Sequence, residues 1–358
     1  MKYIDEYRNR ELVDKLVQQI KSISKKEIVL MEVCGGHTWA IQKFGIPSLM
    51  PQNVKLISGP GCPVCVTDRR FLDHAIALSR RSDVIITTYG DLIRVPGSSS
   101  TLNEEKSQGA DVRIVYSVLD ALKIAHENPT KKVIFLGVGF ETTTPPSAAG
   151  LINAKKENLN NFFLLSSHKV MPPAMGALID EGVAINGYIA PGHVSVITGT
   201  SIYEPIPVNY HVGCVVAGFE PVDILQSIYM LIKQHENNDY KVEIQYKRAV
   251  TAEGNVKARE AINQVFKLRD DWWRGLGTLP LSGLGINDTY ADFDAEKIEV
   301  DIEETKEDKG CICGEILKGL KNPNDCKLFG KACSTSNPVG ACMVSHEGAC
   351  NAYFRFNK

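Results

Sequence analysis

The sequence lacks several features that would place it in familiar functional classes. No apolar run approaches the length of a membrane-spanning helix, and the N-terminus, Met1–Glu6, lacks the hydrophobic region of a signal peptide. The chain also has no large excess of charge of one sign. Its 40 basic and 42 acidic residues leave a formal net charge of −2, which does not create a positive field that would hold nucleic acid. We therefore expect a cytoplasmic protein that binds neither a membrane nor a nucleic acid.

Against this background the ten cysteines are conspicuous. Thiols in the cytoplasm are normally kept reduced, so metal binding or redox chemistry explains them better than structural disulfides do. Three lie early, one stands alone and six crowd the C-terminal region: Cys34, Cys62 and Cys65; Cys214; and Cys311, Cys313, Cys326, Cys333, Cys342 and Cys350.

Short apolar runs alternate with segments of helical period over most of the chain. The runs are 28–33, 54–57, 84–88, 112–116, 133–138, 162–165, 187–190 and 215–217, and the helical segments are 5–21, 68–80, 117–127, 171–181, 221–235 and 253–267. Apolar strands separated by helices are typical of parallel sheets covered on both faces. The pattern predicts an α/β fold with two parallel-sheet lobes, 1–130 and 131–267.

The last third of the chain differs in composition. Residues 268–290 contain two tryptophans and a Gly-rich stretch without the G-K-[ST] or G-x-G-x-x-G pattern of a phosphate-binding loop, so we interpret them as a loop packed on the body. An acidic connector and the crowded cysteines follow. We expect 268–358 to form a connector and a cysteine-rich C-terminal domain.

Reactive side chains follow the predicted strands, where the site of a parallel α/β sheet lies. They are Cys34 and His37, Cys62 and Cys65, Glu141 and Thr142, and His193. Strand-to-helix loops are always rich in turn and capping residues, which accounts for the threonines and prolines there. It does not account for three cysteines and two histidines, so we expect these to form a site.

Each candidate also has a structural interpretation. A helix start after Cys34 would lower the pKa of its thiol, and His37 is either a ligand, a proton carrier or a helix cap. Cys62 and Cys65 at C-x-x-C spacing can reach one metal ion or each other, whereas a buried structural pair fits their Gly- and Pro-rich loop poorly. Glu141 either moves protons or is a charge near a helix N-terminus. Cys214, inside an apolar run, is expected to be a buried, inert thiol.

The cysteines of the tail are separated by Gly, Pro and Asn, which leave little material for a core. An inorganic centre is therefore expected to hold the segment together. Zinc and an iron–sulfur cluster with four thiolate ligands both remain open. The absence of a local C-x-x-C pair of the zinc-ribbon kind favours the cluster.

Five motifs occur in order along the chain. They are Cys34–Thr38 (CGGHT), Gly59–Cys65 (GPGCPVC), Gly139–Thr143 (GFETT), Pro191–Ser195 (PGHVS) and Gly340–Cys350 (GACMVSHEGAC). Together they closely resemble the HypD family of hydrogenase maturation factors, and the resemblance runs nearly from end to end.

This resemblance implies a role in building the Fe(CN)₂CO group of [NiFe]-hydrogenases, as a redox-active assembly scaffold more than a free-standing turnover enzyme. It implies a [4Fe–4S] cluster, a small chaperone partner, HypC, and a transient partner, HypE, which donates cyanide from a thiocyanate. Iron is implied to bind at Cys34, Cys62 and Cys65. The cluster is assigned to Cys311, Cys326, Cys333 and Cys350, and a thiol/disulfide pair to Cys313 and Cys342. His37, Glu141, Thr142 and His193 would assist the chemistry of cyanide.

Two rival interpretations come from other functional classes. One is an independent thiol–disulfide oxidoreductase that uses Cys62 and Cys65, although thioredoxin-like pairs open a helix directly and lack the preceding Gly and Pro residues. The other is a zinc-stabilised binding module without redox function. Iron and sulfide, as opposed to zinc, in the purified protein would separate it from the cluster hypothesis.

Overall fold

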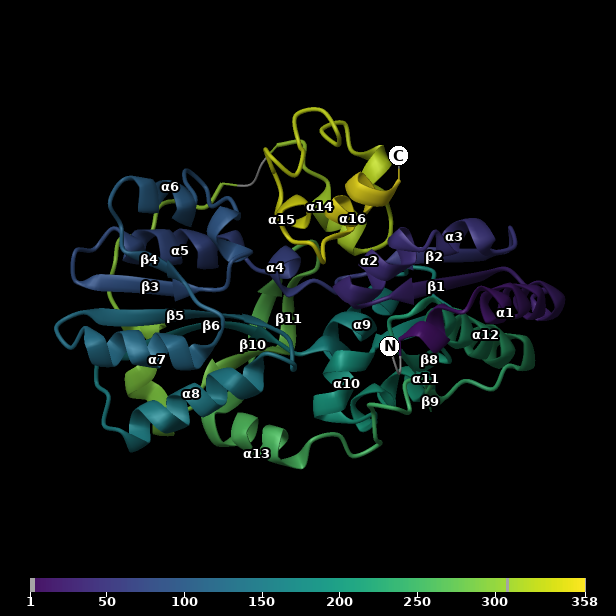
Figure 1. Ribbon diagram of the computed structural model, residues 1–358, viewed down its shortest axis with the longest axis horizontal. Helices are drawn as coiled ribbons and strands as arrows, with labels where there is room; N and C mark the ends of the chain where they lie inside the picture. Colours follow the sequence, from purple (N-terminus) through teal and green to yellow (C-terminus); the bar gives the residue numbers. More distant parts are fainter. Residues whose placement is uncertain (1–3, 307–308, 358) are drawn as a thin grey trace.

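A computed structural model describes residues 4–306 and 309–357 of the chain. Strands and helices alternate along it, and two mostly parallel sheets carry the fold, which confirms the α/β prediction. Figure 1 shows two lobes side by side along the long axis, with the yellow C-terminal segment lying over their junction. No helix in the described ranges is both long and apolar enough to cross a membrane.

The first sheet has the strand order β2-β1-β7-β8-β9, and every neighbouring pair is parallel. Its strands are β1 (Ile28–Glu32), β2 (Val54–Ser58), β7 (Gly187–Pro191), β8 (Gly213–Ala217) and β9 (Val242–Ile244). The central strands β7 and β8 are buried along their whole length, as expected of strands covered on both faces. The amphipathic helices α1 (Arg10–Ile23) and α12 (Pro221–Asn237) pack together and bury Val17 and Ile20 in the core beside β1 and β8.

The second sheet has the order β10-β11-β6-β5-β3-β4. Its strands are β3 (Val84–Thr88), β4 (Val112–Ile114), β5 (Lys132–Gly139), β6 (Phe162–Lys169), β10 (Phe266–Trp273) and β11 (Gly277–Ile286). The first four are parallel, and the last two add an antiparallel hairpin to the edge of β6.

The two sheets do not follow the order of the chain. The first sheet takes its strands from residues 28–58 and 187–244, and the second takes them from residues 84–169 and 266–286. A boundary at 130/131 therefore does not separate the lobes, because β3 and β4 lie in the same sheet as β5 and β6. Local periodicity identifies the strands, whereas the pairing of β1 with β7 joins residues more than 150 positions apart, as in Leu30 with Gly187.

The interpretation of 268–290 as a packed loop is wrong, because this stretch forms most of the β10–β11 hairpin. Charged residues occupy both odd and even positions of β10, namely Lys267, Arg269, Asp270 and Asp271, so its period-two pattern is weak in the sequence. Gly275 and Gly277 make the turn with φ values of 86° and 73°, a region that favours glycine. The hairpin carries the buried Trp273 and, just after it, Arg274 into the junction between the lobes.

The remaining helices connect the strands. They are α2 (Gly35–Lys43), α3 (Ile46–Leu49), α4 (Pro63–Val66), α5 (Arg69–Ser79), α6 (Leu102–Ser107), α7 (Val118–Glu127), α8 (Thr144–Lys156), α9 (Met171–Asp180), α10 (Gly192–Thr198), α11 (Pro205–Tyr210) and α13 (Val256–Val265). Short 3₁₀ turns are η1 (Asp5–Arg8), η2 (Leu92–Arg94), η3 (Ser201–Tyr203), η4 (Asp288–Phe293) and η5 (Ala295–Lys297).

The C-terminal segment has little secondary structure, as its composition predicts. It contains α14 (Cys313–Leu317), η6 (Pro323–Asp325), α15 (Ala341–Val344) and α16 (Ala349–Phe356). α15 packs on α4 and α16 packs on α2, so the segment covers the loops that follow β1 and β2 (Figure 1). Part of the predicted acidic connector, residues 307 and 308, lies outside the described residues.

Candidate cysteine-lined site

The first two cysteine loops lie against each other at the carboxyl edge of the first sheet. β1 leads into Cys34, the N-cap residue of α2, and β2 leads into the loop Gly59–Cys65. The Gly35 amide donates to the Gly61 carbonyl oxygen at 2.9 Å. A Cβ atom on Gly61 would lie 2.1 Å from the Cys34 amide nitrogen, so only glycine permits this approach.

Cys62 and Cys65 are joined by a disulfide bond, and both are almost fully buried. The Arg274 guanidinium reaches them from the hairpin and donates to the carbonyl oxygens of Cys65 and Thr67, each at 3.0 Å. No local pattern marks Arg274 as part of the site, since it lies 209 residues beyond Cys65 in the chain. The hypothesis that Cys62 and Cys65 bind iron as thiolates therefore concerns their reduced form.

The pKa of the Cys34 thiol is raised, which contradicts the expectation that the helix N-terminus lowers it. Burial of the thiol and the negative charge of Glu347 raise the pKa to about 12, and they outweigh the backbone N–H groups of His37 and Gly36, which favour the thiolate. A helix N-terminus contributes about 0.3–1 kcal/mol to a nearby anion, whereas desolvating a charge costs several kcal/mol. Cys34 is therefore protonated at neutral pH in this state.

A buried carboxyl group that the sequence analysis did not single out lies beside Cys34. Glu32, at the end of β1, accepts hydrogen bonds from the Thr38 hydroxyl at 2.5 Å and from the Cys34 amide at 3.1 Å. Burial raises its pKa to about 8 in spite of these bonds. The signal that could have found it is a charged residue inside the apolar run 28–33.

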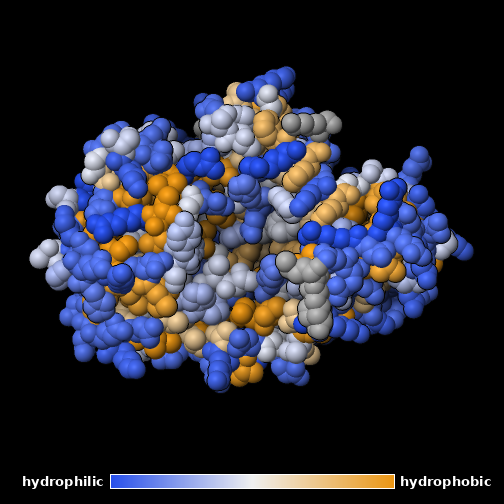
Figure 2. Space-filling view, viewed as in Figure 1, coloured by the Kyte–Doolittle hydropathy of each residue, from blue (hydrophilic) through white to orange (hydrophobic). Residues whose placement is uncertain are grey.

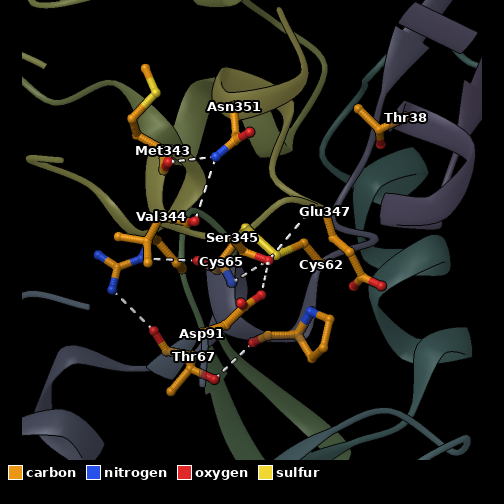
Figure 3. The surroundings of a disulfide bond; sticks show 12 residues. Thr38, Cys62, Cys65, Thr67, Asp91, Met343, Val344, Ser345, Glu347 and Asn351 are labelled. Carbon is orange, nitrogen blue, oxygen red and sulfur yellow. Dashed lines mark hydrogen bonds between the residues drawn. A yellow bond between two sulfur atoms is a disulfide. The ribbon is translucent and has the colours of Figure 1, made fainter. Parts of the chain in front are cut away.

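A second carboxyl group reaches the site from the C-terminal segment. A Cβ atom on Gly35 would lie 2.2 Å from the Cβ of Glu347, so the segment passes directly over the start of α2. Burial and the charge of Asp91 raise the pKa of Glu347. Figure 3 shows Met343, Val344 and Ser345 along one side of the Cys62–Cys65 disulfide, with Glu347 between the disulfide and Thr38. The sequence motif contains Glu347, but its neighbours in space could not be read from it.

Two of the candidate histidines, His37 and His193, both stack on the ring of Phe219. The Phe219 ring lies 4.6 Å from the His37 ring and 4.0 Å from the His193 ring, between centroids. His37 Nε2 lies 3.2 Å from the Ala217 carbonyl oxygen and 3.0 Å from that of Gly218, so Nε2 carries the proton. Nδ1 is buried and has no hydrogen-bond partner among the described residues. Burial lowers the pKa of His37 to about 4, so the ring is neutral and does not cap α2.

Glu141 and Thr142 follow β5 in the other lobe. Glu141 is buried; its Oε1 accepts a hydrogen bond from the Met171 amide at 3.0 Å, and its Oε2 has no partner in the described part of the chain. Burial raises its pKa to about 7. Burial raises the pKa of Tyr203, and the charges of Glu141 and Cys34 add to this effect, so Tyr203 lies close to both groups. Glu141 therefore lies near the site without a direct bond to either cysteine loop.

The tail cysteines gather around one apolar cavity. The cysteines that line the cavity are Cys311, Cys313, Cys326, Cys333 and Cys350. A Cβ atom on Gly340 would lie 2.8 Å from the Cys311 sulfur and 2.9 Å from the Cys313 sulfur, so both sulfurs point at this glycine. Hydrogen bonding to Cys313 and then burial raise the pKa values of Cys311 and Cys350.

This donor set fits a metal centre. Crowded thiols that disfavour one another's ionisation are stabilised as thiolates by a cation, and an apolar surrounding suits an iron–sulfur cluster. Across residues 4–306 and 309–357 no three His, Cys, Asp or Glu groups already form a coordination site. The four cysteines assigned to the cluster all line the cavity, and Cys313 lies among them; zinc would use the same donors.

Cys342 is not among the cysteines that line the tail cavity. It is a buried, free thiol in α15, the helix that packs on α4 with Cys65. One hydrophobic cluster contains the disulfide, Cys313, Cys342 and Cys350. By contrast, Cys214 is enclosed in β8, where burial raises its pKa, as expected of an inert thiol.

Comparison with known proteins shows the family to which the chain belongs. The model of the HypD family, described as "Hydrogenase formation hypA family", matches residues 11–357. The chain is 46% identical to the hydrogenase maturation factor HypD of Azotobacter vinelandii, covering all of this chain and 97% of that protein. It is 43% identical to HypD of Escherichia coli K12, with 100% and 99% covered, and 45% identical to HypD2 of Bradyrhizobium diazoefficiens, with 100% and 97% covered. Since both comparisons extend over nearly the whole chain, the chain belongs to the HypD family.

Proposed function

We propose that this chain, as a HypD-family hydrogenase maturation factor, is a cytoplasmic scaffold on which an iron atom acquires cyanide and CO ligands. The small chaperone HypC holds the iron together with this chain, and HypE delivers cyanide from a thiocyanate. The iron with its ligands is the cargo of the scaffold. The protein acts only within this complex and not as a free-standing enzyme.

The observation that carries the proposal is the meeting of three sulfur-bearing segments. Cys34 lies beside the loop with Cys62 and Cys65, and the cysteine-rich tail covers both. Low-spin iron with cyanide and CO ligands favours soft thiolate donors, which Cys34 and the reduced pair would supply. A generic binding module has no need for nine cysteines around one junction.

Cys34 is protonated until a soft metal displaces the proton. Glu347, the carboxyl group whose charge acts most strongly on this thiol, is assigned as the acceptor of that proton. The Thr142 hydroxyl and His193 are assigned to hydrogen bonding with cyanide nitrogens, and the neutral His37, whose Nδ1 carries no proton, is assigned as a further ligand or as a proton acceptor. Glu141, with a pKa of about 7, can take up or release a proton at neutral pH.

Release of cyanide from a thiocyanate is a reduction. Breaking the S–C bond of R–SCN with two electrons and one proton gives R–SH and CN⁻. Reduced Cys62 and Cys65 supply both electrons when they form their disulfide, and they release two protons. The pair no longer binds the iron as thiolates at that step, so Cys34 is the thiolate ligand that remains from this chain. One proton goes to the departing thiolate and the other is left for Glu141. Cys311, Cys326, Cys333 and Cys350 would hold a [4Fe–4S] cluster, and when bound it would supply the electrons that return the pair to its reduced form. Cys313 and Cys342 are assigned to pass these electrons on.

Infrared spectroscopy of the complex co-purified with HypC and HypE tests the proposal, because bound cyanide and CO have separate bands. Wild type is expected to show both, and Cys34→Ser is expected to lose them. Cys214→Ser, a change in the buried thiol of β8, is the matched control and should keep them. Full band intensity in Cys34→Ser would contradict the proposal, and reduction of generic disulfides by the isolated protein would favour the oxidoreductase.

A further inference from the structure

One aromatic ring that the proposed function leaves without a role contacts both candidate histidines. The Phe219 ring stacks on the His37 ring with an angle of 21° between their planes, and on the His193 ring with an angle of 24°. Phe219 lies just after β8, His37 lies in the first turn of α2 after β1, and His193 lies in the first turn of α10 after β7. Because β1, β7 and β8 are neighbours in the first sheet, three adjacent strand ends each supply one ring to the same stack.

The stack runs from the core of the protein to its surface. His37 is fully buried, Phe219 is half-buried and His193 is exposed. The helix α10, which carries His193, lies at the junction of the lobes in Figure 1, and Figure 2 shows the surface hollowed at this junction. Phe219 therefore touches one imidazole that the protein encloses and one that reaches solvent.

Phe219 also contacts the helical turn that begins at Cys34. A Cβ atom on Gly36 would lie 3.0 Å from Phe219 Cε1 and 3.7 Å from the Cys34 sulfur, so the ring and the thiol approach the same glycine. The first distance is tighter than a side chain at position 36 readily accepts, so glycine lets the ring come close to the backbone of α2. The ring thus lies near the thiol of the site as well as against its two imidazoles.

The side chains around Phe219 hold its ring in place. The Tyr246 ring meets it at 90°, with 6.0 Å between centroids. The Arg248 guanidinium lies 4.5 Å from the Tyr246 ring centroid, and it donates to Asp223 Oδ1 at 2.7 Å. Asp223 is fully buried, and a Cβ atom on Gly218 would lie 2.4 Å from its Oδ2 atom, so the loop that carries Phe219 is tightly packed. The fold itself therefore sets the orientation of the Phe219 ring.

An aromatic ring can orient an imidazole without occupying its nitrogens. The Phe219 side chain has neither a hydrogen-bond donor nor an acceptor, so it contacts the faces of the imidazoles and leaves their edges free. For His37, the contacts of Nε2 with the carbonyl oxygens of Ala217 and Gly218 fix the rotation of the ring within its plane, and the stack fixes the plane. Nδ1, which has no hydrogen-bond partner among the described residues, keeps its lone pair free. An aliphatic side chain would fill the same space but would not impose a plane.

We propose that Phe219 is a positioning residue of the site, whose ring holds the imidazoles of His37 and His193 in the planes in which they act on the iron or on its cyanide ligands. Phe219 itself takes no part in the reaction. The inference rests on the proposed function, which includes both histidines in the site. It explains why an aromatic residue follows β8, at a place where packing alone would accept any large apolar side chain.

Substitutions that separate the ring from its bulk test this proposal. Phe219→Leu and Phe219→Met keep a large apolar side chain but remove the ring, whereas Phe219→Tyr keeps the ring. In the complex co-purified with HypC and HypE, we expect the infrared bands of bound cyanide and CO to fall at least about fivefold in the first two variants and to stay within about twofold of wild type in Phe219→Tyr. Phe163→Leu, at a half-buried phenylalanine of β6 in the other lobe, is the matched control and should keep the bands.

Nuclear magnetic resonance of the protein labelled at its histidines measures the stacking directly. The ring current of Phe219 displaces the imidazole proton signals of His37 and His193. Both displacements should vanish in Phe219→Leu and persist in Phe219→Tyr, which a change in packing alone would not produce. Thermal unfolding of each variant, followed by circular dichroism, establishes that the compared proteins are folded.

Bands of wild-type intensity in Phe219→Leu and Phe219→Met would overturn the positioning role, and so would unchanged imidazole signals in these variants. A loss of the bands in Phe219→Tyr or in Phe163→Leu equal to that in Phe219→Leu would also overturn it, since the effect would then not depend on this ring. Absence of the bands in the wild-type complex would instead contradict the proposed function, and this inference with it.

Discussion

Replacing Gly61 with alanine tests whether the two cysteine loops depend on direct backbone contact. The added Cβ atom would lie 2.1 Å from the Cys34 nitrogen and 2.5 Å from the Cys34 Cα atom, both on the rigid junction of β1 and α2. Overpacking usually costs about 1–3 kcal/mol. Loss of the hydrogen bond from Gly35 to Gly61 adds about 1 kcal/mol. We expect the free energy of unfolding to fall by about 2–4 kcal/mol, whereas Gly→Ala at an unstrained position stabilises by about 0.4–1 kcal/mol through the unfolded chain.

Urea unfolding at constant pH measures this change through the midpoint and the slope. Gly90→Ala is the matched control, because its Cβ atom would meet only Ile114 Cγ2, at an ordinary 3.8 Å. In Gly61→Ala the loops should also separate, so Cys34 should react faster with an alkylating reagent. The reasoning is refuted if Gly61→Ala is as stable as Gly90→Ala and Cys34 keeps its wild-type reactivity.

Three further predictions concern the same site. The raised pKa of Glu32, about 8, means that the folded state keeps a proton that the unfolded state loses above about pH 4.5, so its contribution to stability falls as pH rises from 4.5 to 8. Glu32→Gln should therefore be close to wild type at pH 5 and gain at least about 1 kcal/mol relative to it at pH 8, by urea unfolding at both values; a loss at pH 8 would be contrary to this. Glu347→Gln removes a negative charge that raises the pKa of Cys34, so alkylation of Cys34 at pH 9 should become faster, with an unchanged rate as the opposing result. Arg274→Ala leaves the carbonyl groups of Cys65 and Thr67 without their donor and should cost about 2–4 kcal/mol, part of which Arg274→Lys restores.

Local patterns predicted the strands β1 to β8, but not β9 to β11, and they could not assign strands to sheets. The apolar runs at 84–88 and 187–190 match β3 and β7 almost residue for residue, because buried parallel strands are continuously apolar. The pairing of β1 with β7 joins distant segments, and nothing in either strand specifies the other. The β10–β11 hairpin was missed because four charged residues interrupt β10 at both odd and even positions, as in a surface loop.

The site shows the same division. Cys34 and the Gly59–Cys65 loop could be placed together because each follows a parallel strand. Arg274 and Glu347 could not, since each arrives from a segment far along the chain. The raised pKa of Cys34 also could not be predicted from the sequence, because the sequence shows where α2 begins but not how deeply the thiol is buried.

Iron and acid-labile sulfide in the anaerobically purified protein test most directly whether the converging tail cysteines hold an iron–sulfur centre. We expect about four iron and four sulfide per chain with absorption near 400 nm. Both should be lost in Cys350→Ser and kept in Cys214→Ser. Zinc without sulfide in the wild-type protein, or a full complement of iron and sulfide in Cys350→Ser, would contradict the account.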